Sequence, residues 1–267
     1  MTRSASVLLL LMGFLTGCTG TSVPGSVYSS DPAPQPVSQQ AVSGQVRNRA
    51  RTHTELGAAY LEAGRVAPAL DEARTAINVD DGYPLAHNLL ALVYMALKEN
   101  GPAEESFQHA LQLAPGDPDI SNNYGWFLCE TGRAAKAMPY LQTAFRNPLY
   151  ASPALALNNA AVCSTRLGDD RSAEGYLQRA MRVDPNNLRG LYLLSDLTYR
   201  QGRYQEAKLY LAELHRKTDI TAGSAWLGLR IARKLGDRGE EARYVSQLRQ
   251  RFADSAENEL LAQGRYE

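Results

Sequence analysis

The four histidines are the side chains of this 267-residue sequence best suited to metal binding or to general acid–base chemistry. They stand at His53, His87, His109 and His215, with no pair at helical spacing. The sequence also contains no HExxH, GxSxG or phosphate-loop motif. We therefore expect no enzymatic activity, no cofactor and no metal site, and we interpret each histidine as a surface or helix-face residue.

Cys18 is the residue for which the sequence does indicate covalent chemistry. Arg3 and the apolar residues 7–15 come before it and predict a signal peptide over residues 1–17. The apolar run is too short to span a bilayer, which needs about 20 residues. The Leu-Thr-Gly-Cys sequence resembles a bacterial lipobox, which implies that the thiol receives a diacylglyceryl group and the new amine is acylated. An ordinary signal peptide cut elsewhere is the alternative.

A lipidated Cys18 would make the chain a permanent membrane resident, because each buried methylene contributes roughly 0.8 kcal/mol. Thr19 follows the cysteine, where the lipoprotein sorting pattern uses Asp for retention in the inner membrane. That resemblance implies delivery to the periplasmic face of the outer membrane of a Gram-negative bacterium. Residues 18–49 are predicted as the lipidated cysteine and a disordered tether, because Ser, Pro, Gly, Thr and Gln dominate most of this stretch. A flexible tether of this length reaches roughly 30 Å.

A repeated pattern of small residues organises the rest of the sequence. Alanine recurs every 34 or 36 residues at Ala69, Ala103, Ala137, Ala173 and Ala207, and at Ala242 if one inserted residue is allowed. The pattern is typical of tetratricopeptide repeats. It predicts an all-α fold, a right-handed superhelical solenoid of about six repeats with a C-terminal capping helix. The tetratricopeptide domain, residues 50–267, divides into units 50–83, 84–117, 118–153, 154–187, 188–221 and 222–254 and a cap at 255–267.

Charge and cysteine spacing narrow the function further. Lys and Arg together number 28, as do Asp and Glu, and no basic stripe indicates nucleic-acid binding. Cys129 and Cys163 lie 34 residues apart and could meet on neighbouring helices. Packed helix axes are about 8–10 Å apart, whereas a disulfide needs its Cα atoms within about 7 Å. We therefore expect two small thiols, buried or facing the groove.

In tetratricopeptide proteins, the concave face is lined by residues on the first helix of each unit. They stand at positions 2, 5, 9, 12 and 13, counted from the first residue of the unit. Applied here, this family rule predicts a partner-binding groove with an apolar strip made of Leu92, Met95, Trp126 and Val162. Such a strip suits a peptide with apolar anchors. The groove predicted by the rule contains Leu85, Asn88, Leu92, Met95, Asn122, Trp126, Asn158, Val162, Tyr192 and Tyr199.

Asparagine recurs at position 5 of three successive units, at Asn88, Asn122 and Asn158. An amide both donates and accepts hydrogen bonds, so such a row can hold a peptide backbone. Asn123 and Asn159 stand next to this row and favour a second interpretation, in which the amides form a structural network between units. The residues leave both interpretations open.

Three stretches, NNYGWFL (122–128), PLY (148–150) and AWLGLRIA (225–232), together with the lipobox and the polar tether, resemble one family. This is the PilF/PilW family of type IV pilus biogenesis and stability lipoproteins, the pilotins of the pilus secretin. The family usually has another residue where Trp126 stands. In the family the partner groove is attributed mainly to the first units, which here implies Ala58 and Leu61 beside Leu92 and Met95.

The resemblance implies a non-enzymatic outer-membrane lipoprotein that binds secretin subunits and promotes their localisation and multimerisation. Its partners would be a protein and a membrane, with no nucleic acid and no small-molecule substrate. The alternative is a general periplasmic scaffold lipoprotein that docks cell-wall enzymes or outer-membrane assembly components with the same fold and anchor.

Overall fold

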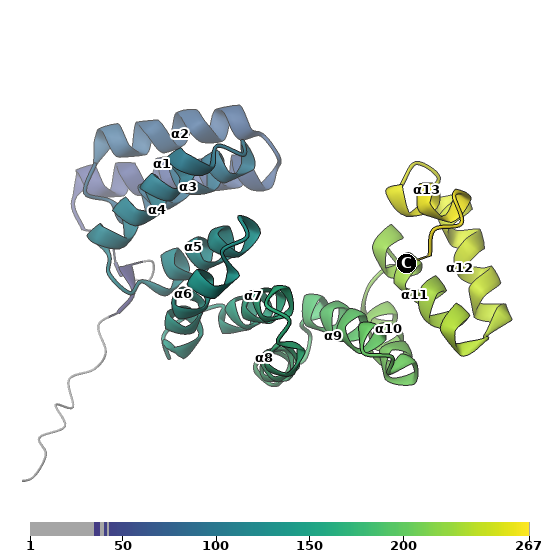
Figure 1. Ribbon diagram of the computed structural model, residues 1–267. Coiled ribbons are helices and arrows are strands. Elements are labelled where there is room, and N and C mark those ends of the chain that lie inside the picture. Colours follow the sequence, from purple (N-terminus) through teal and green to yellow (C-terminus); the bar gives the residue numbers. More distant parts are fainter. Residues whose placement is uncertain (1–34, 38–39, 42, 267) are drawn as a thin grey trace, which may run out of the picture. The chain divides into compact units, whose positions relative to one another are not determined.

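A computed structural model describes residues 35–37, 40–41 and 43–266. Thirteen α-helices and no strand occur in this part of the chain (Figure 1). The helices are α1 Gln45–Glu62, α2 Val66–Val79, α3 Pro84–Ala96, α4 Asn100–Leu113, α5 Pro118–Glu130, α6 Ala134–Arg146, α7 Pro153–Arg166, α8 Asp170–Val183, α9 Leu188–Arg200, α10 Tyr204–Lys217, α11 Ala222–Leu235, α12 Arg238–Arg251 and α13 Ala256–Ala262.

The first twelve helices form six helix-turn-helix pairs, from α1–α2 to α11–α12 (Figure 1). Each second helix packs on the first helix of the next pair, and first helices such as α3 and α5 also contact one another. The short helix α13 packs on α11 and α12 and buries Leu261. The predicted all-α repeat fold with a C-terminal capping helix is therefore confirmed.

Close approach between paired helices depends on small residues. The alanines at the five regular positions from Ala69 to Ala207 are all fully buried. At Gly57 an added Cβ would lie 2.6 Å from Leu89 Cδ2, and at Gly125 it would lie 2.8 Å from Leu141 Cγ. These glycines are required because the leucine of the facing helix occupies the space of a side chain.

The sixth pair departs from the predicted alignment. Ala242 is exposed, and Glu241 stands four residues after the helix cap Asp237, where the fifth pair has Ala207 after Arg203. The alignment of Ala242 with the other alanines, which required one inserted residue, was therefore wrong. Glu241 makes an ion pair with Arg233 at 2.8 Å, so a polar contact replaces the alanine contact of the other pairs.

Glycine ends five of the first helices in the left-handed region, as helix C-termini commonly do. These residues are Gly64, Gly132, Gly168, Gly202 and Gly236, with φ between 70° and 79°. The second pair has Lys98 at this place, with φ of 62°, and no other non-glycine residue in the described part of the chain has a positive φ. The Lys98 turn still makes the same two hydrogen bonds as the Gly132 turn.

The N-terminal part of the array begins earlier than predicted. Helix α1 starts at Gln45, so the prediction that residues 45–49 belong to a disordered tether was wrong. Arg47 explains the extra turn, because it pairs with Asp80 and lies over the Tyr83 ring. Further upstream, Val37 packs against the apolar side of the second and third pairs, where Leu85 also lies.

The predicted signal peptide, Cys18 and the tether up to residue 34 lie outside the described residues. Among the described helices, none combines the length and the hydropathy needed to cross a bilayer.

Cys129 on α5 and Cys163 on α7 form a disulfide, with Cα atoms 5.7 Å apart. The prediction of two free thiols was wrong because it compared the Cα limit with a separation of helix axes. Each Cα lies about 2.3 Å from its own axis. Cα atoms on facing sides of two helices are therefore about 4–5 Å closer than the axes. The disulfide joins the first helices of the third and fourth pairs.

Candidate partner-binding surface

The predicted apolar strip lies on three neighbouring first helices. Leu92 and Met95 come from α3, Trp126 from α5 and Val162 from α7, and all four are half-buried. Leu92, Met95 and Trp126 pack with one side against the largest buried cluster of the array, which is built around the α5 and α6 aromatic residues. These three side chains therefore have fixed positions and still offer apolar surface to a partner.

Trp126 is flanked by two arginines that the prediction did not include. The guanidinium carbon of Arg189, from α9, is 5.2 Å from the Trp126 ring centroid, and that of Arg166, from α7, is 5.7 Å away. Arg166 also donates to the Cys129 carbonyl oxygen at 2.7 Å and pairs with Glu130. The indole of the strip thus lies close to two cations, a setting that stabilises the ring and the arginines through cation–π attraction.

A signal for these arginines was present in the sequence. Arg166 occupies position 13 of its unit and Arg189 occupies position 2 of the next, and both positions belong to the family rule for the concave face. Both are charged, whereas the predicted groove rests on apolar and amide side chains.

The asparagines form a ladder across the first helices. Asn159 donates to Asn122 at 2.9 Å, Asn122 donates to Asn123 at 3.2 Å, and Asn123 donates to Asn88 at 3.2 Å. Asn122 is 2% exposed and Asn88 9% exposed, so the amides contact one another rather than solvent. Of the two open interpretations, these positions support the structural network.

Asn158 belongs to a second amide pair, which joins the fourth and fifth repeats. It exchanges two hydrogen bonds with Asn187, at 3.0 and 3.2 Å, and is 3% exposed. Asn187 in turn accepts from the Gly190 amide at 2.9 Å and caps α9. The amide at position 5 therefore fixes the start of the next first helix.

The remaining predicted groove residues are spread along the array. Ala58 and Leu61 are half-buried beside the cluster of the first two pairs, and Leu85 is half-buried beside Val37. Tyr192 is half-buried, and burial followed by the Asp196 carboxylate raises the pKa of its phenol, which keeps it neutral.

Tyr199 is only 7% exposed, because it belongs to the buried cluster of the fifth and sixth pairs and the Arg230 guanidinium carbon lies 4.5 Å from its ring centroid. It therefore contributes mainly to packing between the fifth and sixth pairs. Apart from Tyr192, the predicted groove residues that are half-buried all belong to the first four repeats.

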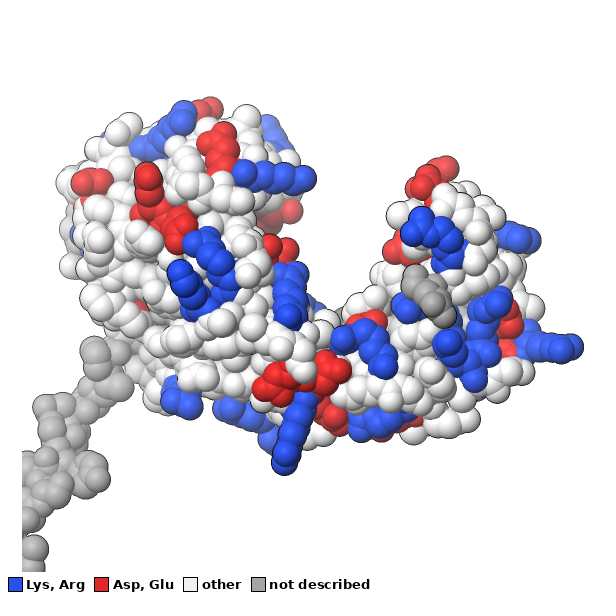
Figure 2. Space-filling model, viewed as in Figure 1, with Lys and Arg blue, Asp and Glu red and all other residues white. Residues whose placement is uncertain are grey.

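Charge does not gather on the face shown in Figure 2, where acidic and basic side chains are interspersed among uncharged ones.

The histidines are less scattered than their spacing suggests. His87 on α3 and His109 on α4 have ring centroids 4.3 Å apart, because antiparallel pairing brings the start of one helix beside the end of the next. The prediction considered spacing within one helix, which cannot detect such a pair.

Comparison with known proteins gives consistent matches. The tetratricopeptide repeat family matches residues 73–220. The type IV pilus assembly protein PilF of Pseudomonas aeruginosa is 29% identical over 256 residues, and the alignment covers 96% of each chain. The crystal structure of PilW, a widely conserved type IV pilus biogenesis factor, has a TM-score of 0.75 at 30% identity. The Pseudomonas aeruginosa PilF structure has a TM-score of 0.71 at 27% identity. Each of these two matches covers 82% of this chain and 100% of the other.

Proposed function

The chain belongs to the tetratricopeptide repeat proteins and, within them, to the PilF/PilW family of type IV pilus biogenesis factors, and we propose that it acts in pilus assembly as a lipid-anchored pilotin. In this proposal it binds secretin subunits in the periplasm. It then promotes their localisation to the outer membrane and their assembly into multimers. The role is one of binding, without catalysis.

The apolar strip of Leu92, Met95, Trp126 and Val162 is the observation that carries this proposal. Its members are half-buried on three neighbouring first helices, and Leu92, Met95 and Trp126 are held by the core cluster beneath them. Apolar residues held in this way gain free energy when a partner covers them, at about 25 cal/mol per Å² removed from water. In this proposal an unassembled secretin subunit exposes apolar surface, and the strip would cover it.

The anchor supplies the second half of the proposal. A lipidated Cys18 would hold the array at a membrane, and Thr19 in place of Asp supports outer-membrane sorting. Val37 packs against the second and third pairs, so the packed part of the array reaches upstream to residue 37. The array would then work close to the bilayer in which the multimer forms.

Substitution in the strip tests the binding surface. Met95→Glu and Leu92→Arg each place a charge on an apolar contact, which commonly costs at least about 2 kcal/mol at a binding hot spot. Leu209→Arg is a matched control, because Leu209 lies on the second helix α10 and is 70% exposed. Heat-resistant secretin multimers should disappear with Met95→Glu and Leu92→Arg and persist with Leu209→Arg, while thermal unfolding shows that all three variants are folded.

Unchanged multimers in folded strip variants would refute the assignment of the surface. If the array then captured cell-wall enzymes or outer-membrane assembly components in the same way as before substitution, the general scaffold function would be favoured.

Substitution of the cysteine tests the anchor separately. Cys18→Ser should leave the array folded and able to bind secretin subunits but remove it from the outer-membrane fraction. Recovery of this variant in that fraction would show that another device sorts the protein.

A further inference from the structure

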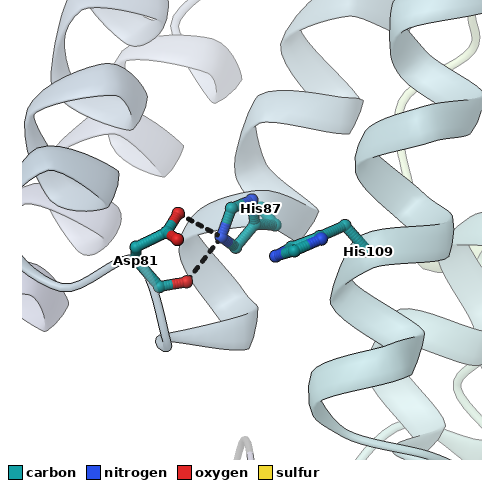
Figure 3. Close-up of side chains that lie close together, drawn as sticks. All are labelled: Asp81, His87 and His109. Carbon is teal, nitrogen blue, oxygen red and sulfur yellow. Dashed lines mark hydrogen bonds and ion pairs between the residues drawn. The ribbon is translucent and has the colours of Figure 1, made fainter.

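Three side chains of the types that bind transition metals meet where the first repeat joins the second. Asp81 lies in the turn between α2 and α3, His87 lies on α3 and His109 on α4 (Figure 3). One ligand atom from each can be chosen so that all three lie within 4.8 Å of one another. No other group of three or more such residues meets this condition among the residues that the structure describes.

The distance between two of these ligand atoms already fits tetrahedral coordination. The Asp81 Oδ1 and His87 Nε2 atoms are 3.4 Å apart. With bonds of about 2.0–2.1 Å, two ligands of a tetrahedral zinc ion lie about 3.4 Å apart. His109 would need to move toward this pair by about an ångström or more, which a rotation of its side chain can provide.

The surroundings of His87 favour a cation. Its Nε2 points at two oxygens of Asp81, the carboxylate oxygen at 3.4 Å and the main-chain carbonyl oxygen at 2.7 Å (Figure 3). In the metal-free protein the Nε2 proton occupies this place and is donated to the carbonyl oxygen. A metal ion would replace that proton and exchange its hydrogen bond for a coordinate bond. His87 is 7% exposed, so packing already holds its ring in place.

We propose that Asp81, His87 and His109 form a binding site for a divalent transition metal of the zinc class. Two imidazoles and one carboxylate are a ligand set that such ions accept, and water would complete a tetrahedral zinc site. The metal would tie the turn between the first two repeats to both helices of the second. It would therefore stiffen the part of the array next to Leu85 and the apolar strip. This proposal does not depend on the function in pilus assembly.

Calorimetric titration with Zn²⁺ tests the site on the full chain, purified in detergent without a polyhistidine tag and treated with a chelator. We expect one zinc ion per chain and a rise in the thermal midpoint when zinc is present in excess. Co²⁺ should give the visible absorption of a tetrahedral complex.

Variants distinguish this site from adventitious binding. His109→Ala and Asp81→Asn should each weaken zinc binding by at least the roughly 10–100-fold that loss of a supporting partner costs at known sites. His53→Ala is the matched control, because His53 contacts Glu72 at 2.6 Å and is outside the cluster. It should bind zinc like the parent. Absence of saturable zinc binding, or equal binding in His109→Ala, would overturn the proposal.

Discussion

Replacing Lys98 with glycine should stabilise the array, because this lysine holds a backbone conformation that the other repeats give to glycine. Its φ is 62°, and the left-handed region costs a residue with a side chain about 1–2 kcal/mol. Glycine removes that strain but gives the unfolded chain more freedom, which costs roughly 0.4–1 kcal/mol. The difference predicts a net gain of about 0.5–1 kcal/mol for Lys98→Gly. For a domain of this size, a change of 1 kcal/mol corresponds to roughly 2–4 °C in thermal midpoint.

The reverse substitution at Gly132 should have the opposite effect. The two turns are equivalent: the amides of residues 98 and 132 donate to the carbonyls three residues before them, at 3.1 Å in both cases. An added Cβ at Gly132 would have no atom outside its immediate neighbours within 4 Å, so Gly132→Ala tests backbone strain without a steric clash. We expect it to lower stability by about the amount that Lys98→Gly adds.

Lys98→Ala completes the experiment, because it removes the amine and most of the side chain but retains the strain. Thermal and urea unfolding should place Lys98→Gly above both the parent and Lys98→Ala. Equal midpoints for the alanine and glycine variants would show that the backbone strain inferred from φ makes no net contribution, and the reasoning would fail.

Three further predictions concern the disulfide and the last two repeats. Breaking the Cys129–Cys163 bond opens a loop of 34 residues and should lower the free energy of unfolding by about 4 kcal/mol in the chain-entropy estimate. Urea unfolding with and without reductant measures this difference. Detection of both thiols in unfolded protein that has not been reduced would contradict the prediction. Gly228→Ala should cost about 1–3 kcal/mol by overpacking, because the new Cβ would lie 2.4 Å from the buried Tyr244 ring, and an unchanged urea midpoint would argue against this packing. Burial and, after it, the positive charge of Arg243 lower the pKa of His215 below its ordinary value of about 6.5. On acidification, the unfolded chain therefore binds a proton at this histidine before the folded chain does. Stability should therefore fall as the pH drops below about 6.5, and it should fall less in His215→Gln if this histidine is the cause.

The sequence predicts the repeat fold because its evidence is local and recurs. Alanine at a fixed position and glycine in the turn before it each act within one helical pair, and five copies average out single departures. In the sixth repeat the pattern is weaker, and aligning Ala242 with the alanines of the other repeats gives the wrong equivalence. Glu241 replaces the alanine there through a contact with Arg233, and no spacing rule anticipates such a polar substitute.

Contacts between side chains of different helices were harder to predict because they depend on distances that no pattern supplies. The disulfide is one example, since a difference of about 4–5 Å between axis and Cα separations decides whether the bond forms. The pairing of His87 with His109 is another, because it needs the relative shift of two antiparallel helices. The arginines beside Trp126 come from two other units, so only the folded array shows the three side chains together.

The asparagine ladder bears on how the proposed surface would recognise a partner. An amide row with free donors and acceptors would hold any extended backbone and would bind with little regard to sequence. The amides of Asn122 and Asn158 are instead buried in bonds to other asparagines, at 2% and 3% exposure. In the proposed function, recognition on the first helices would then come from side chains that retain surface, Leu92 and Met95 among them. A partner bound in this way is selected for its apolar residues, which is why a single charge at either position should be enough to remove it.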